Sequence, residues 1–93
     1  MASKNTEISE DVTVVNDLGM HARSAAKIAE IAKEAGARTW LQRDDERVDA
    51  RSIIDILTLA CGKGSTLTIV IEDPADLDTL NRIVKLVQAG FGE

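Results

Sequence analysis

Residues 66–76 pass from a strand pattern to a helix start, in the run Thr66-Leu67-Thr68-Ile69-Val70-Ile71-Glu72-Asp73-Pro74-Ala75-Asp76. Three of the apolar residues, Leu67, Ile69 and Ile71, occupy alternate positions, which is the period of a strand with one buried face. Asp73 then provides a helix N-cap, Pro74 suits the first helical position, and Asp76 adds an acidic residue to the first turn. This stretch therefore predicts a strand over residues 66–72 and a helix that begins after Asp73.

The rest of the chain follows the same two periodicities. The last helix is expected to end at Gly90 and to bury Leu77, Leu80, Ile83, Val84 and Val87. The patterns also predict strands over residues 11–15, 38–43 and 47–50, a helix over 22–35 that stops at Gly36, and a short helix from Ser52 to the turn 62–64. A three-residue loop, 44–46, would join the two middle strands as a hairpin.

The predicted element order is β-α-β-β-α-β-α, which indicates an α+β fold. We expect a four-stranded, mostly antiparallel sheet with all three helices on one face. A flexible N-terminal segment, residues 1–8, would precede a single domain over residues 9–93. With 93 residues there is room for one small core and no deep pocket, which favours a protein that acts on or with other proteins.

Composition excludes several classes of function. The net charge of −5, together with one Trp, one Phe and no Tyr, argues against a nucleic-acid-binding module. No apolar run is long enough to cross a membrane, and the N-terminus lacks the apolar segment of a secretory signal, so we expect a cytoplasmic protein. The single cysteine, Cys61, has no partner for a disulfide or a metal site and is interpreted as a small buried hydrophobic residue.

The only histidine, His21, stands just before the first predicted helix. The unpaired N–H groups and the positive dipole end of a helix N-terminus bind anions, and they favour a neutral, nucleophilic imidazole near pH 7. Arg23 is close enough in sequence to place a guanidinium beside a phosphoryl group, and Gly19 permits a sharp turn that leaves the ring accessible. On these residues alone, a nucleophile and an ordinary surface or capping histidine both remain open.

A resemblance decides between them. The run Asn16-x-Leu18-Gly19-Met20-His21-Ala22-Arg23 resembles the active-site motif of the histidine-containing phosphocarrier (HPr) family of the bacterial phosphotransferase system. Residues 50–54 resemble the family's regulatory serine segment at the family's spacing from the histidine, and residues 59–64 resemble the turn before its last strand. The resemblance covers about residues 8–93 and implies an open-faced β-sandwich.

The resemblance implies a phosphoryl carrier and not an enzyme. His21 would accept a phosphoryl group at Nδ1 from an enzyme I-type donor of a phosphoenolpyruvate-dependent system. It would pass the group to an enzyme IIA-type acceptor, for sugar uptake or for regulation. Arg23 would stabilise the phosphoryl group, and Gly19, Ala22 and Ser24 would position it. No metal and no cofactor of its own is implied, and we expect a monomer.

Two positions depart from the family's usual pattern. Ser24 stands where the family commonly has Pro, so the chain loses a rigid backbone angle and gains a hydroxyl that could cap the helix or contact a phosphate. Asp55 makes the partner-facing helix more acidic than in sugar-type members. The sequence of the motif, residues 16–23, and that of the chain end, residues 89–93, are similar to the nitrogen-related branch of the family.

The partner-facing surface is expected beside His21. A short helix cannot bury every apolar side chain, so part of the apolar surface of the helix after Ser52 should be exposed. We expect a docking face made up of Met20, Arg51, Ile53, Ile54 and Leu57.

Ser52 has a structural interpretation and a regulatory one. Ser followed by Asp three residues later is a helix N-cap resembling a capping box. The family resemblance adds phosphorylation by a serine kinase/phosphorylase.

Two other functions are considered. One is a regulatory, protein-binding adaptor of the same fold, controlled by phosphorylation at Ser52. The presence of His21 with Arg23 argues against an adaptor that carries no phosphate. The other is a small hydrolase with His21 as base, which the lack of a placed Ser or Cys nucleophile disfavours.

Overall fold

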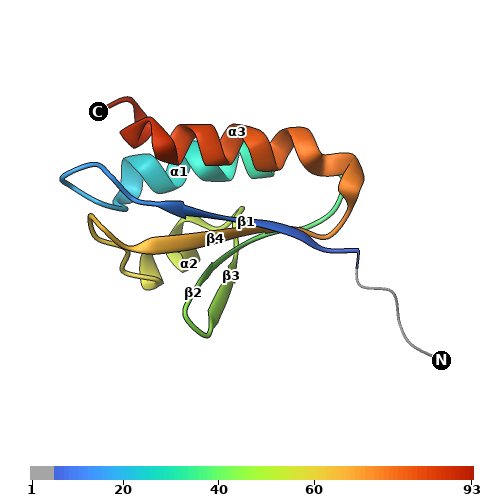
Figure 1. Cartoon of the computed structure of the whole chain (residues 1–93), viewed down its shortest axis with the longest axis horizontal. Coiled ribbons are helices and arrows are strands. Elements are labelled where there is room, and N and C mark those ends of the chain that lie inside the picture. The colour runs from blue at the N-terminus through green and yellow to red at the C-terminus, as the bar shows by residue number, and fades with distance from the viewer. Residues whose placement is uncertain (1–5) are drawn as a thin grey trace.

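The four strands form one antiparallel sheet in the order β1-β4-β2-β3. The computed structural model describes residues 6–93, so the flexibility expected of residues 1–5 lies outside the described residues. The strands are β1 (Ile8–Thr13), β2 (Thr39–Arg43), β3 (Glu46–Asp49) and β4 (Thr66–Ile71). The helices are α1 (Ala22–Ala32), α2 (Ile53–Thr58) and α3 (Leu77–Gln88), with short 3-10 turns at η1 (Pro74–Asp76) and η2 (Gly90–Gly92). The predicted βαββαβα order is confirmed (Figure 1).

Strand β4 lies in the middle of the sheet and carries the alternation seen in the sequence. It pairs with β1 from Ile8↔Ile71 to Thr13↔Thr66 and with β2 from Thr39↔Ile71 to Gln42↔Thr68. Its alternate residues Leu67, Ile69 and Ile71 are fully buried and join one hydrophobic core, as predicted. Val70 is buried as well, on the other face of the sheet, where it lies opposite Trp40.

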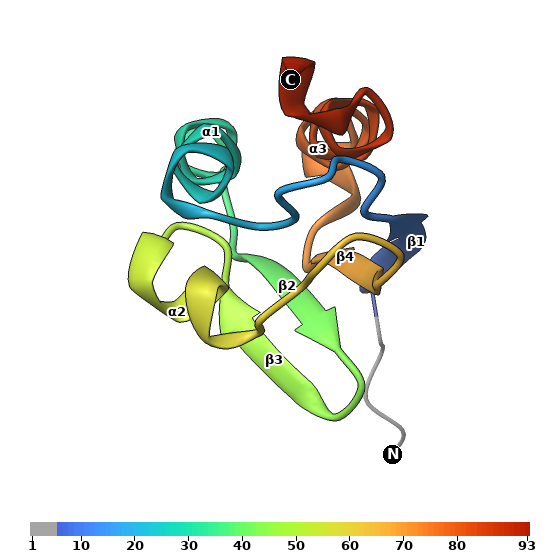
Figure 2. The ribbon, with the colours of Figure 1, turned by 90° about the vertical axis from the view of Figure 1, so that its left-hand side faces the viewer.

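The helices cover the core face of the sheet. Helices α1 and α3 run side by side over it, while α2 lies beside the β3 end of the sheet and packs against α1 (Figure 2). Most of the predicted apolar positions of α3 are buried, namely Leu80, Ile83, Val84 and Val87. Leu77 is an exception: it is 46% exposed, because it begins the helix next to the exposed turn 73–75. The buried stripe of α3 instead starts at Thr79.

Strand β1 lies earlier in the chain than predicted. The sequence pattern placed it at residues 11–15, whereas it spans Ile8–Thr13. Its partner β4 sets these limits, since Ile8 pairs with the last residue of β4 and Thr13 with the first. Within the segment expected to be flexible, Thr6 Oγ1 donates to the Glu72 carbonyl at 2.8 Å, and Glu7 forms an ion pair with Arg47.

The first two helices are shorter than predicted, and side chains from distant residues bind the backbone that follows each of them. Helix α1 ends at Ala32 and not at Ala35, and Gly36 does not act as a left-handed stop. Instead, the Asp76 carboxylate accepts the N–H groups of Gly36 and Ala37 at 2.9 and 3.0 Å.

Helix α2 ends at Thr58, before the predicted 62–64 turn, and Ala60 has a positive φ of 51°. The Arg43 guanidinium donates to the carbonyls of Leu59 and Ala60 at 3.0 and 2.7 Å, and so satisfies the end of the helix. The hairpin is also tighter than predicted. Because Arg43 pairs with Glu46, the loop has two residues, and Asp44 takes a φ of 53° there.

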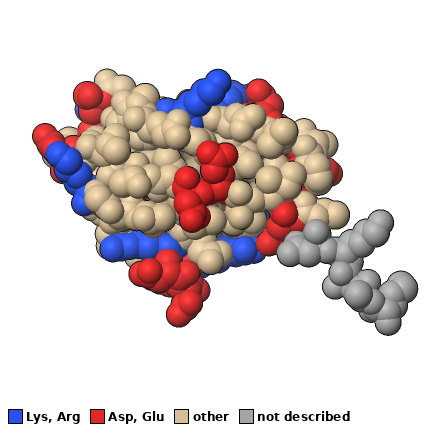
Figure 3. All heavy atoms as spheres, viewed as in Figure 1, with Lys and Arg blue, Asp and Glu red and all other residues tan. Residues whose placement is uncertain are grey.

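The surface of the molecule carries both signs of charge. On the face drawn in Figure 3, acidic and basic side chains are interspersed among neutral ones, without a continuous basic patch. Within residues 6–93, no helix has the length and apolar character that crossing a bilayer requires.

Candidate active site around His21

His21 is the N-cap residue of α1. Its backbone is extended, with φ −130° and ψ 179°, and its carbonyl accepts the first helical hydrogen bond, from Ala25 N–H, at 2.9 Å. The His21 N–H donates to the hydroxyl of Ser24 at 2.9 Å, and Ser24 is fully buried beneath the turn. The His21 side chain is 29% exposed, so the ring is held against the protein at one side and open to solvent at the other.

The loop before His21 has a shape that requires glycine. Gly19 has φ +65°, and a Cβ built there would lie 2.7 Å from the Cys61 carbonyl oxygen and 2.8 Å from Gly62 Cα. The next residue, Met20, donates its N–H to the same Cys61 carbonyl at 2.7 Å. Cys61 is buried, as predicted, and burial raises the pKa of its thiol. The loop that positions His21 is therefore packed directly on the 61–62 backbone.

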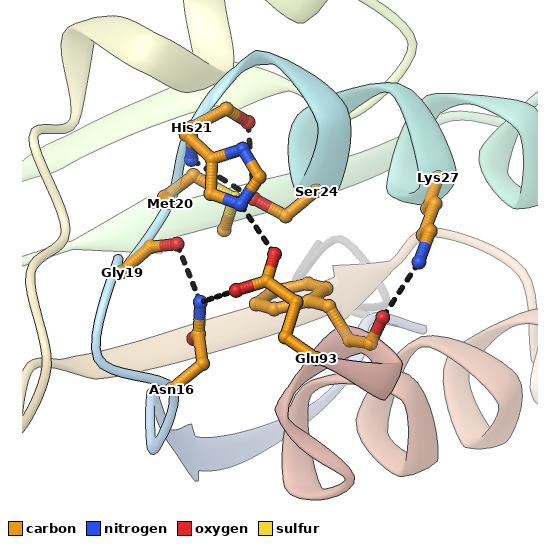
Figure 4. A network of polar contacts seen from close by, with 8 residues as sticks. Asn16, Gly19, Met20, His21, Ser24, Lys27 and Glu93 are labelled. Atoms are coloured by element: carbon orange, nitrogen blue, oxygen red, sulfur yellow. Dashed lines mark hydrogen bonds and ion pairs between the residues drawn. The ribbon is translucent and has the colours of Figure 1, made fainter.

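The imidazole has a carboxylate partner that the sequence did not reveal. Nε2 of His21 contacts Oε2 of Glu93, the two residues being 72 positions apart, and the other ring nitrogen faces away from Glu93 (Figure 4). Asn16 Nδ2 donates to the other carboxylate oxygen of Glu93 at 3.0 Å and to the Gly19 carbonyl at 2.8 Å. Asn16 belongs to the motif of residues 16–23 but had no predicted role. Glu93 belongs to residues 89–93, whose similarity to one branch of the family gave no indication of a contact with His21.

The Glu93 carboxyl is held in its ionised form. Its hydrogen bonds with His21 and Asn16, and then the charges of His21 and Lys27, lower its pKa below the ordinary value of 4.5. A carboxyl whose folded pKa is depressed stabilises the fold above its ordinary pKa and loses that contribution as pH falls through the folded value. The ionised Glu93 carboxylate therefore contributes to stability at neutral pH, and this contribution is lost in acid.

Ala22 and Arg23 are the first two residues of α1, and both are exposed. Among the described residues, the Arg23 guanidinium has no hydrogen bond or ion pair. No hydrogen bond therefore joins Arg23 to His21 in this structure. The guanidinium is available at the helix end whose unpaired N–H groups favour an anion.

Helix α2 carries three of the five residues predicted for partner docking, Ile53, Ile54 and Leu57. Ser52 is its N-cap, as predicted, and its hydroxyl accepts the Asp55 N–H at 3.2 Å. Ile54 is 76% exposed, Ile53 and Leu57 are 37% and 36% exposed, and Ile56 is buried. Met20 is half-buried against the core. The Arg51 guanidinium is paired with Asp49 at 3.1 Å, which lowers the pKa of Asp49. The only cation in the predicted docking set is thus already bound to a carboxylate.

Replacing Ser24 with Ala is expected to destabilise the protein by about 1 kcal/mol, because the His21 N–H would lose its acceptor in a buried position. Urea-induced unfolding measures the change. Thr58→Ala is the matched control: its hydroxyl is exposed and bonds the carbonyl of Asp55, so its effect should stay within about 0.5 kcal/mol. Equal midpoints for the two variants would show that the Ser24 hydroxyl does not support the turn.

Comparison with known proteins places this chain among phosphocarrier proteins. Residues 8–89 match the family described as the PTS HPr component phosphorylation site. The phosphocarrier protein HPr of Cupriavidus necator is 34% identical over 86 residues, which cover 92% of this chain and 97% of that protein. The phosphocarrier protein NPr of Shewanella violacea is also 34% identical, over 88 residues that cover 95% of this chain and 97% of that protein.

Solved structures agree. The crystal structure of HPr from Bacillus anthracis superimposes with a TM-score of 0.83 at 32% identity, covering 90% of this chain and all of that one. HPr and NPr relatives match at equal identity, so similarity assigns the family and not a branch. The chain belongs to the HPr family and is a phosphocarrier of the phosphotransferase system, a protein that carries a phosphoryl group without being an enzyme.

Proposed function

We propose that the phosphoryl group is carried on Nδ1 of His21. The observation that supports this is the ring's placement at the N-cap of α1: Nε2 is occupied by Glu93, while the other nitrogen faces away from Glu93 (Figure 4). The Nδ1 lone pair forms the new N–P bond as the bond between phosphorus and the donor breaks. The reverse exchange, with an acceptor as nucleophile, returns the ring to its starting state.

The start of α1 supplies the electrostatic part of the site. A phosphoryl group on Nδ1 would meet the positive end of the helix and the N–H groups that have no intrahelical partner. Arg23, free of other partners among the described residues, would add a charge-assisted hydrogen bond. Ala22 stands between His21 and Arg23 in the chain, and Gly19 and Ser24 act indirectly by fixing the backbone on either side of His21.

We further propose an enzyme I-type protein as donor and an enzyme IIA-type protein as acceptor, both docking on one surface. The docking surface consists of Met20, Arg51, Ile53, Ile54 and Leu57. Its support is the exposure of three large apolar side chains on α2, a helix that packs against α1. An exposed apolar patch beside a reactive group is suited to transient contact with successive partners.

The experiment is incubation of the chain with phosphoenolpyruvate and an enzyme I-type donor, followed by mass spectrometry at neutral pH. One phosphoryl group per chain is expected, with the acid-labile, base-stable behaviour of a phosphoramidate. Fragmentation should place it on His21. A phosphate on a serine, or none in the presence of an active donor, would refute the assignment.

Phosphorylation of Ser52 by a serine kinase/phosphorylase is a second, regulatory proposal. Ser52 stands at the N-cap of α2, where a phosphate is tolerated electrostatically, and it directly precedes Ile53 and Ile54 of the docking surface. Arg51 is engaged with Asp49 and offers little compensation for the added negative charge.

Ser52→Asp is expected to slow phosphorylation of His21 while changing stability by less than about 1 kcal/mol, because Asp is as good an N-cap as Ser. The added charge would weaken the encounter with an acidic donor surface, and salt should reduce the difference. Donor-dependent rates at two ionic strengths and thermal melts measure both effects.

Ser9→Asp is the control. It adds the same charge at an exposed site on β1, the edge of the sheet opposite β3. If Ser52→Asp and Ser9→Asp have equal rates at low salt, Ser52 lies outside the docking surface.

A further inference from the structure

The last four residues, Gly90–Glu93, form a left-handed turn that folds back from α3 to the start of α1. We call them the C-terminal turn. Gly90, Phe91 and Gly92 have φ angles of 64°, 59° and 76°, and Gly92 and Glu93 donate their N–H groups to the carbonyls of Ala89 and Gly90. Two of these three positions are glycine, which adopts such angles without steric cost.

Packing and a lysine hold the turn in place. Phe91, the non-glycine residue with positive φ, is fully buried in the core, and this burial offsets the strain of its backbone. Lys27 of α1 donates from Nζ to the Phe91 carbonyl at 2.6 Å. The turn is therefore fixed to α1 and to the core before its last side chain reaches the histidine.

The Glu93 carboxylate lies between two residues of the active-site loop. Its Oε1 accepts the Asn16 amide at 3.0 Å, and its Oε2 contacts Nε2 of His21 (Figure 4). Lys27 adds positive charge nearby and helps to keep the carboxyl ionised. An ionised carboxylate can only accept hydrogen bonds, so the nitrogen that contacts it must carry a proton.

We propose that Glu93 is a positioning residue that selects the Nε2–H tautomer of His21 and so leaves the lone pair on Nδ1. This rests on the proposed function, in which Nδ1 takes the phosphoryl group. A neutral imidazole has one protonated nitrogen and one with a free lone pair, and the partner of the first decides the tautomer. Glu93 thereby acts on the nucleophile through the far side of the ring.

The same contact fits the charge change during transfer. When Nδ1 forms its bond to phosphorus, the ring becomes an imidazolium whose remaining proton stays on Nε2, facing Glu93. When the phosphoryl group leaves, the electron pair of the N–P bond returns to Nδ1 and the ring is again the neutral Nε2–H tautomer. No proton enters or leaves the histidine in either direction, and the carboxylate balances the transient positive charge.

The test is the tautomer of His21 in the unphosphorylated protein, from the ¹⁵N shifts of both ring nitrogens at a pH where the ring is neutral. In Glu93→Ala, the population of the Nδ1–H tautomer should rise about threefold or more. Glu93→Gln keeps an acceptor oxygen and should restore most of the Nε2–H tautomer. The maximal phosphorylation rate of Glu93→Ala should fall about fivefold, as the ring loses its fixed orientation.

Glu30→Ala is the matched control, since it removes one exposed carboxylate from α1 away from the ring; its tautomer ratio and rate should equal those of the native chain. An unchanged tautomer ratio in Glu93→Ala would overturn the role of Glu93. If the ratio shifts as expected but native His21 takes no phosphate from an active donor, the coupling of Glu93 to the ring is supported and the proposed function fails.

Discussion

Replacing His21 with alanine is expected to abolish phosphoryl transfer and to leave the chain folded. The chain contains no other histidine, and no other nucleophile is held at the N-cap of α1. The His21 backbone supports the turn, since the N–H donates to Ser24 and the carbonyl accepts from Ala25. Alanine keeps both of these hydrogen bonds and loses the exposed side-chain contact with Glu93, so stability should change by no more than about 1 kcal/mol.

The measurement combines phosphate incorporation by mass spectrometry with a thermal melt. Arg23→Ala is the informative comparison, because it removes a proposed stabilising charge and keeps the nucleophile. It should slow incorporation by about 10- to 100-fold without preventing it. A phosphorylated His21→Ala chain would mean that a different residue carries the group.

Replacing Gly19 with alanine is expected to destabilise the protein by about 3 kcal/mol and to impair transfer as well. A left-handed φ of 65° disfavours any side chain, and the new Cβ would lie 2.7 Å from the Cys61 carbonyl oxygen, so backbone must move. The displaced segment includes Met20, whose N–H bonds that same carbonyl, and leads directly into His21. Misplacing the ring lowers the rate even in the molecules that remain folded.

Gly62→Ala is the control for Gly19→Ala. A Cβ at Gly62 would have no neighbour within 4 Å, and its φ is not in the left-handed region. Its stability should stay within about 1 kcal/mol of the native value, or rise slightly because the unfolded chain loses freedom. Urea unfolding of both variants, with phosphorylation rates measured well below the transition, separates the effect on the fold from the effect on the site. Equal unfolding midpoints for the two variants would contradict the steric argument.

The order of elements could be predicted because it depends on short-range patterns. The alternation of Leu67, Ile69 and Ile71 places all three side chains on one face of a strand, and that face must be the buried one. The helix ends at Ser52 and Gly90 depend on residues only a few positions away. Element limits were less accurate where a distant partner sets them. Strand β1 takes its limits from β4, α2 ends where Arg43 binds the carbonyls of Leu59 and Ala60, and Asp76 holds the segment that follows α1.

The site, too, has features that nearby residues set and features that distant residues set. The sequence by itself determined that His21 stands at a helix start with Arg23 beside it, since caps and helix dipoles are local properties of the chain. Only the tertiary structure decided that Glu93 meets Nε2 of His21 and that Gly19 lies against the Cys61 carbonyl. Those contacts join residues far apart in the chain, and they exist only after the core has closed around Phe91 and brought the C-terminal turn to the first helix. Periodicity and capping describe what a segment can form, whereas packing selects which distant side chain completes it.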